Sequence, residues 1–143
     1  MNARILFIAA AFTAGLFFNS CEKDESIPGP VVTITELGHG NSKTGIAGSD
    51  LHIDAEVVAE GRIDRITISI HPEHSHGTKG LNDDKWEVDT TFTEYSGLKN
   101  TKFHKDIDIP AGAKPGHYHF TLTVTDMEGQ QTAIDDEIEI LQP

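Results

Sequence analysis

Cysteine is almost absent from this chain of 143 residues, in which Cys21 is the only one. A single thiol cannot close an internal disulfide, so a hydrophobic core has to hold the fold without covalent cross-links. The length is enough for one domain after processing of the N-terminus.

Basic residues are also scarce. The sequence has 11 Lys and Arg against 23 Asp and Glu, which gives a net charge of −12 at pH 7. A domain with this excess of negative charge repels nucleic acid and anionic membrane surfaces, and it attracts cations and basic partners. We therefore expect no nucleic-acid function.

Catalytic motifs are missing as well. The sequence shows no Ser/His/Asp arrangement with a nucleophile motif and no cysteine nucleophile. Gly38, Gly40, Gly45 and Gly48 lie between expected strands and not before a helix, which argues against a dinucleotide-binding loop. We therefore expect that the protein is not an enzyme.

The N-terminus carries an apolar run from Ile5 to Phe18, preceded by Arg4. This run is too short to cross a bilayer as a helix, but it suits the apolar region of a secretory signal peptide. We predict a signal peptide over residues 1–20. Its removal leaves 10 Lys and Arg against 23 Asp and Glu, a net charge of −13.

Cys21 follows this run closely, and "FNSC" resembles the lipobox of bacterial lipoproteins, with Phe18 in place of the usual leucine. The resemblance implies that Cys21 is acylated and becomes the mature N-terminus, lipid-anchored in the outer membrane. Each buried methylene of the acyl chains contributes about 0.8 kcal/mol to anchoring. The alternative is an ordinary signal peptide with an incidental cysteine.

Residues 21–30 form the expected linker to the folded domain. The stretch "EKDESIPGP" resembles the acidic export tag of surface-exposed lipoproteins of the Bacteroidota, which implies display on the cell surface. It also suits a simple solvated linker. Pro28, Gly29 and Pro30 end it with a stiff spacer.

Residues 31–143 alternate apolar and polar side chains with a period of two, which indicates strands. In "HYHFTLTVTD", for example, Tyr118 and Phe120 share an inward face while His117 and His119 point outward. No stretch after Cys21 has convincing helical periodicity. We predict seven strands, over residues 31–37, 50–58, 62–71, 86–93, 102–109, 117–126 and 130–141.

Seven short strands with frequent turns predict an all-β fold, a seven-stranded immunoglobulin- or fibronectin-like antiparallel sandwich. The stretch "NTKFHKDIDIPAGAKPGHYHFTLTVTDMEGQQT" resembles the last three strands of bacterial Ig-like domains. More closely, most of the mature chain is similar to a lipoprotein family of the Bacteroidota known as a domain of unknown function, most strongly from Trp86 to Thr132. The resemblance implies an Ig-like lipoprotein and assigns no activity and no functional residues.

Histidines gather at one end of this expected sandwich. His71 ends the third strand, and His117 and His119 begin the sixth. In a fibronectin-type topology these strands are neighbours, and parity places all three imidazoles outward, where they can converge on one ion at about 2.0–2.1 Å. The loop after the third strand adds His74 and His76, and the last strand adds Glu137 and Glu139 as ligands or acceptors.

The other three histidines are expected to lie outside this cluster. His52 faces outward from the other sheet, which makes it a poor co-ligand. His39 lies in a Gly-rich loop that reaches either side, and His104 lies partway along the fifth strand, apart from the other seven histidines.

Imidazole and carboxylate ligands suit zinc best, and copper(II) and nickel are chemically plausible. Calcium and haem suit the sequence less well, because no EF-hand loop is present and the outward face offers few apolar residues to cover a porphyrin. We predict an envelope lipoprotein that binds a divalent metal ion, as an accessory to uptake. Two alternatives stay open: a polar surface with incidental metal affinity, and an interaction or adhesion module that docks on an outer-membrane transporter or another lipoprotein.

Overall fold

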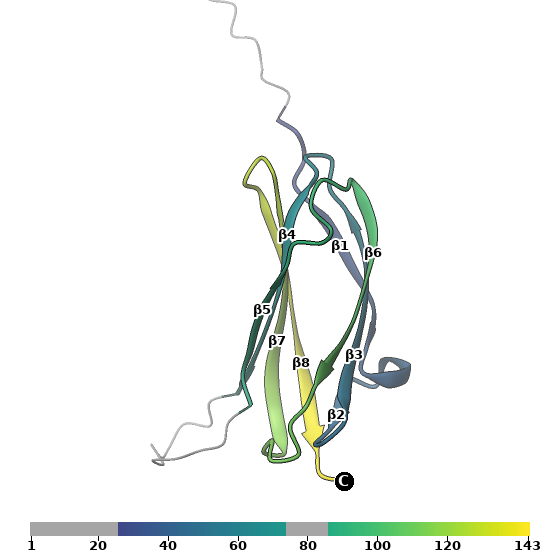
Figure 1. Ribbon diagram of the computed structural model, residues 1–143, viewed down its shortest axis with the longest axis vertical. Helices are drawn as coiled ribbons and strands as arrows, with labels where there is room; N and C mark the ends of the chain where they lie inside the picture. Colours follow the sequence, from purple (N-terminus) through teal and green to yellow (C-terminus); the bar gives the residue numbers. More distant parts are fainter. Residues whose placement is uncertain (1–25, 74–85) are drawn as a thin grey trace, which may run out of the picture.

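Two β-sheets pack face to face in the computed structural model, which describes residues 26–73 and 86–143 (Figure 1). The three-stranded sheet has the order β1-β3-β6, and the five-stranded sheet has the order β2-β8-β7-β4-β5. The strands are β1 (Val31–Leu37), β2 (Thr44–Ile46), β3 (Asp50–Val58), β4 (Ile63–Pro72), β5 (Val88–Phe92), β6 (Asn100–Asp108), β7 (Gly116–Asp126) and β8 (Gln131–Leu141). A 3-10 turn, η1 (His39–Asn41), follows β1.

The prediction of an all-β fold is confirmed, and each predicted strand appears with bounds within two residues of those expected. The count of seven strands is wrong, because β2 adds an eighth within the described residues. β2 also departs from the expected antiparallel pairing, since it runs parallel to the end of β8. Three residues around Gly45 carry no alternation, and this strand exists only through its tertiary pairing. A side chain at Gly45 would collide with the side chain of Ile109, so the close approach of β2 requires glycine here.

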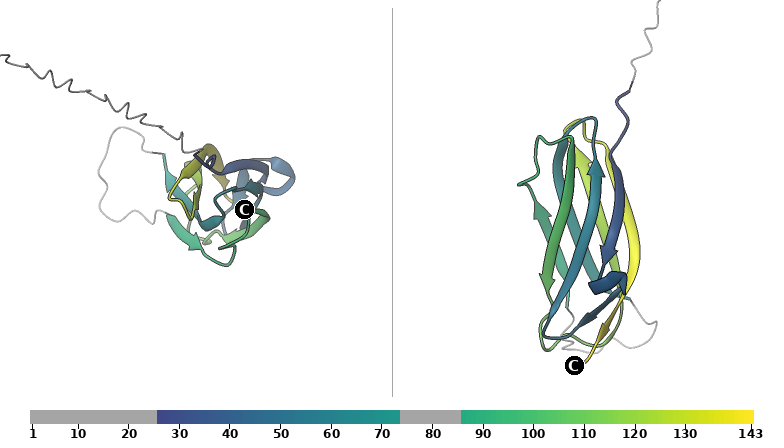
Figure 2. Two further views of the ribbon diagram at one scale, coloured as in Figure 1. Left: turned by 90° about the horizontal axis from the view of Figure 1, so that it is seen from above. Right: turned by 90° about the vertical axis from the view of Figure 1, so that its right-hand side faces the viewer.

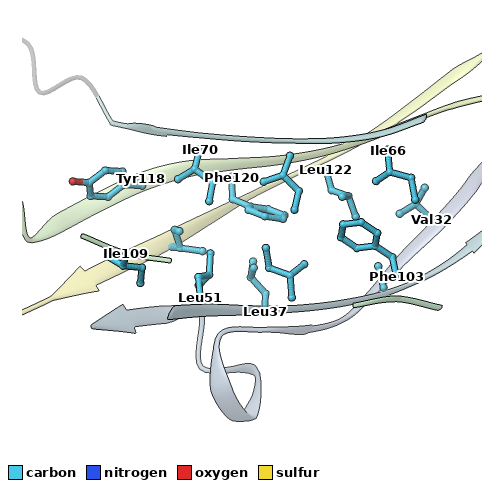
Figure 3. Packing of buried hydrophobic residues seen from close by; sticks show 14 of the residues in the cluster. Val32, Leu37, Leu51, Ile66, Ile70, Phe103, Ile109, Tyr118, Phe120 and Leu122 are labelled. Carbon is cyan, nitrogen blue, oxygen red and sulfur yellow. The ribbon is translucent and has the colours of Figure 1, made fainter. Parts of the chain in front are cut away.

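The core between the sheets is built from the inward-facing residues of both (Figure 3). Leu51 and Phe103 come from the three-stranded sheet, and Ile70, Tyr118 and Phe120 come from the five-stranded sheet. All five are almost completely buried. The inward parity expected for β7 is therefore correct, and it leaves the alternate side chains of each strand on the outer faces.

Lys105 is an exception to the apolar interior of the sandwich. It points inward from β6, an edge strand, and its Nζ lies 2.7 Å from Oε1 of Glu94. The same ammonium group lies 5.0 Å from the ring centroid of Phe92 and 5.6 Å from that of Tyr95. The hydrogen bond from Lys105 lowers the pKa of Glu94 and in turn raises the pKa of Lys105.

The strand order of the five-stranded sheet brings together the segments that carry three of the six described histidines. β4 pairs with β7, as the expected topology predicted, and the register places His71 directly opposite His119. β7 pairs with β8 and places His119 opposite Glu137 and His117 opposite Glu139. Among the described residues, none of the helical structure has the length and apolar character needed to cross a bilayer.

Candidate metal sites

Three neighbouring strands present ligand-type side chains on the outer face of the five-stranded sheet. They form two rows across β4, β7 and β8, because antiparallel register aligns outward residues side by side. Every member is exposed, while the residues between them on β7 and β8, such as Tyr118 and Ile138, are buried. We call this group the β7 site: His71, Glu73, His117, His119, Glu137 and Glu139.

Two contacts join members of the β7 site in pairs. Nδ1 of His117 lies 2.5 Å from Oε1 of Glu137. The imidazole rings of His71 and His119 are tilted by 40° with their centroids 5.3 Å apart. Neutral imidazole nitrogens and carboxylate oxygens at such spacing are the ligands that zinc uses in proteins.

Glu73 completes this arrangement and was not anticipated from the sequence. Its backbone N–H donates to the carbonyl of His117 at 2.9 Å, so the β4–β7 pairing continues to this residue. Ligand atoms of Glu73, His117 and Glu137 all lie within 4.8 Å of one another. Residues two apart on a strand face the same side, so Glu73 points outward like His71. This spacing alone could have identified Glu73 from the sequence.

The predicted ligands divide into three groups. The structure brings His117 together with Glu137 and brings His71 together with His119. Glu139 lies directly opposite His117 in register, yet the carboxylate in contact with His117 is the diagonal Glu137. His74 and His76 lie outside the described residues.

A second group of ligand-type side chains lies on the outer face of the three-stranded sheet. Its centre is two H-x-D tripeptides, His52–Asp54 on β3 and His104–Asp106 on β6. The antiparallel register places His52 opposite Asp106 and Asp54 opposite His104. With the neighbouring carboxylate of β1 this group is called the β3 site: Glu36, His52, Asp54, His104 and Asp106.

Each imidazole of the β3 site lies close to both Asp54 and Asp106. Asp54 lies 2.7 Å from Nδ1 of His104 through Oδ1 and 3.2 Å from Nε2 of His52 through Oδ2. Asp106 lies 2.8 Å from Nδ1 of His52 through Oδ1 and 3.9 Å from Nε2 of His104 through Oδ2. The four side chains therefore form a square of alternating imidazoles and carboxylates.

His52 is the most enclosed member of the β3 site, with 18% of its side chain exposed. The ring of His39 stacks on it at 5.4 Å between centroids, and the ring of His104 meets it edge-on at 5.0 Å. Oε2 of Glu36 lies 3.9 Å from Nε2 of His52. These neighbours fix the orientation of the His52 ring before any ligand binds.

The carboxylates around His52 change its protonation. The hydrogen bond with Asp106 raises the pKa of His52, with a further contribution from Asp54, and burial of the ring opposes the shift. The pKa of Asp54 is lowered, chiefly by its hydrogen bond with His104 and also by that with His52. Both shifts follow from favourable interaction between opposite charges at short distance.

The expectation that His104 stands apart from the other histidines is wrong. Its ring is in edge contact with that of His52, because the β3–β6 register sets the two H-x-D tripeptides against each other. His52 does face outward from the sheet opposite the β7 site, as expected, but it has its own ligand-type partners there. The repeated tripeptide can be seen in the sequence, but the sequence does not show the β3–β6 register that brings its two copies together.

Comparisons with known proteins bear on the fold and the family of this chain, and they assign no role to either group of ligand-type side chains. No curated protein matches the sequence. The structure of catalytically inactive OgpA from Akkermansia muciniphila, in complex with an O-glycopeptide, is similar at a TM-score of 0.52 with 12% identity. The match covers 78% of this chain and 29% of that one, and at this identity it concerns the fold alone.

A Niemann-Pick type C2 protein from the Japanese carpenter ant gives a TM-score of 0.48 with 9% identity, over 83% of this chain and 98% of that one. This likeness is too low to support an argument about function. The family comparison is more extensive, because the model of the domain of unknown function DUF4625 matches residues 19–141. The chain therefore belongs to the DUF4625 family.

Proposed function

We propose that this protein is a lipid-anchored envelope protein that binds a divalent transition metal ion, with zinc the best suited, at the β7 site. The observation that carries the proposal is the meeting of His117, Glu137 and Glu73 from adjacent strands within 4.8 Å. His71 and His119 lie in the next row and offer further nitrogens.

The donor set favours a transition metal over calcium or magnesium. Imidazole suits zinc, copper and nickel, whereas calcium and magnesium take oxygen ligands almost exclusively. The ligands stand on paired strands, so their backbones are already ordered and binding restricts few additional residues. The net charge of −12 favours the approach of any cation.

The anchor rests on the N-terminal sequence. The apolar run from Ile5 to Phe18 ends close to Cys21, and the acidic linker follows. The sandwich architecture, which we assign to the Ig-like class, and the family membership are compatible with a lipoprotein of the Bacteroidota. An anchored domain of this kind would hold the ion at the outer membrane, as an accessory to its uptake.

The test is zinc binding by the full-length chain, purified in detergent and measured by equilibrium dialysis and calorimetry. The double variant His117→Ala/His119→Ala should bind one zinc ion fewer per chain than the wild type. The matched control is Thr121→Ala/Thr123→Ala, which alters the next two outward positions of the same strand.

Binding of the same number of zinc ions with the same affinity by the wild type and the histidine double variant would overturn the proposal. Zinc bound under those conditions would be held elsewhere. The interaction-module alternative would then be the better description of the β7 face.

A further inference from the structure

We propose that the β3 site binds a second divalent transition metal ion, through His52, His104 and Asp106, with Asp54 as the residue that orients both imidazoles. The β3 site lies on the sheet opposite the β7 site and shares no residue with it. The ligand atoms of His52, His104 and Asp106 lie within 4.8 Å of one another.

Asp54 determines which nitrogen of each imidazole carries the proton and which can bind an ion. It is in hydrogen-bond contact with Nε2 of His52 and with Nδ1 of His104. When both nitrogens donate to Asp54, the other two, Nδ1 of His52 and Nε2 of His104, face Asp106. Binding of the ion then replaces the proton that His52 and Asp106 share in the metal-free protein. A carboxylate that accepts the second N–H of a ligating histidine is the usual support of a metal site, since it fixes the tautomer and the ring orientation.

The spacing around Asp106 suits an ion of about 2.0–2.1 Å bond length to each ligand atom. The distances from Asp106 to these two nitrogens are 2.8 Å, a hydrogen bond in the metal-free protein, and 3.9 Å. Ligand atoms in a tetrahedral shell stand roughly 3.3 Å apart at that bond length. Small side-chain rotations about the ordered strands therefore admit the ion.

A second arrangement, of Glu36, His52 and Asp54, also lies within 4.8 Å but offers one imidazole only. Two imidazoles favour a transition metal more strongly than one. In the first arrangement Glu36, 3.9 Å from Nε2 of His52, adds negative charge without ligating the ion. Three carboxylates around two neutral imidazoles carry a charge of −3, and a divalent ion reduces it to −1.

The site is open on its solvent side. The side chains of His104 and Asp106 are 59% and 52% exposed, so water can complete the coordination shell. The enclosed His52 has a fixed orientation as a ligand, whereas the exposed side chains of His104 and Asp106 let the ion and water reach the site. An ion held in this way exchanges with solvent and does not serve as a closed structural centre.

Independence of the two sites follows from the architecture. The sheets stand on opposite sides of the core, and the outer face of the β1-β3-β6 sheet is the one turned to the viewer in the right-hand view of Figure 2. Loss of one ion therefore leaves the ligands of the other in place.

The test uses zinc dialysis and cobalt(II) visible absorption on the full-length chain in detergent. The variant His104→Gln/Asp106→Asn should bind one ion fewer than the wild type and lose one component of the cobalt(II) spectrum. Both side chains are more than half exposed, so the fold should be retained, which far-ultraviolet circular dichroism checks. Asp108→Asn, two residues further along β6, is the control for loss of a single negative charge and should retain every ion.

Unchanged zinc stoichiometry and affinity in His104→Gln/Asp106→Asn would overturn the proposal, as would an equal loss in Asp108→Asn. Combination with His117→Ala/His119→Ala separates the two sites. An ion lost in the β3 variant but not in the β7 variant supports this inference while the proposed function fails, and the reverse pattern has the opposite meaning.

Asp54 has its own test as a positioning residue. Asp54→Asn should weaken zinc binding at the β3 site about 10–100-fold, which is the usual effect of removing a carboxylate that orients a ligating histidine. Its cobalt(II) absorption should keep the wild-type wavelengths, because the ligating atoms are unchanged. A wavelength shift at saturating cobalt would overturn this role and make Asp54 a ligand.

Discussion

Glu137 meets His117 across the diagonal between β8 and β7, with Oε1 2.5 Å from Nδ1, although Glu139 is the residue directly opposite His117. The two glutamates are both exposed and both on the outer face, so they form a matched pair. Because of this diagonal contact, we expect Glu137 to contribute more than Glu139 to the proposed binding of an ion at His117.

We therefore predict that Glu137→Gln weakens zinc binding about 10–100-fold, whether it ligates the ion or supports a ligand. Glu139→Gln removes the same charge from the same strand and should weaken binding much less. Calorimetry with zinc on the two variants checks this. Equal losses of affinity would mean that zinc binding depends on the overall charge of this face and not on the position of the carboxylate.

His52 should titrate above its ordinary value in the metal-free protein. The hydrogen bond with Asp106 is the main cause, so Asp106→Asn should bring the pKa of His52 back toward 6.5. Imidazole chemical shifts followed by NMR against pH, with a chelator present, give the value directly. A His52 pKa below 6.5 in the wild type would contradict the prediction.

The raised pKa of His52 also sets a pH dependence of stability. A group whose pKa is higher in the folded state stabilises that state fully below its unfolded pKa, near 6.5, and the contribution disappears as the pH rises through the folded value. The stability difference between the wild type and Asp106→Asn should therefore shrink on going from mildly acidic to alkaline pH. Asp108→Asn should show no such trend.

Phe120→Ala should reduce the free energy of unfolding by about 3–5 kcal/mol, as is usual for truncation of a buried aromatic side chain. Phe120 is completely buried between the sheets. Thr121→Ala, the next residue along β7, removes an exposed hydrogen bond to Asp135 and should cost about 1 kcal/mol or less. Denaturant unfolding compares the two, and similar costs would be incompatible with an inward Phe120 and an outward Thr121.

Cys21→Ser tests the anchor. The variant should leave the membrane fraction or accumulate with its signal peptide uncleaved, because the acylated residue is gone. Asn19→Ser, a change in the same segment that keeps the cysteine, is the control. Fractionation and gel migration like those of the parent would show that Cys21 carries no lipid.

Alternation of apolar and polar residues is enough to predict seven of the eight described strands and their inward faces. It therefore also predicted which side chains share an outer face at the β7 site, including His71, His117 and His119. Alternation says nothing about how side chains lean along a strand, which is why Glu137 and Glu139 were indistinguishable. β2 escaped prediction because its three residues are ordered by pairing with β8 and not by a pattern of their own.

The β3 site was missed for a different reason. Its residues come from strands 50 positions apart in the chain, and their meeting depends on the exact offset between β3 and β6. A shift of that offset by two residues would separate His104 from Asp54 while preserving every inward and outward assignment. Periodicity carries no information on such offsets, whereas cross-strand geometry fixes them.

The inward lysine on β6 bears on how copies of this protein behave when crowded. An unpaired edge strand is where sheets of separate molecules join and grow into aggregates, and a charged side chain directed inward at the edge is one defence against this. A strand added along β6 would cut Lys105 off from water at the open side of the sandwich, where 27% of its side chain is exposed. We therefore expect the charge of Lys105 to disfavour edge-to-edge pairing of β6 between two copies, because a strand added there would desolvate its ammonium group.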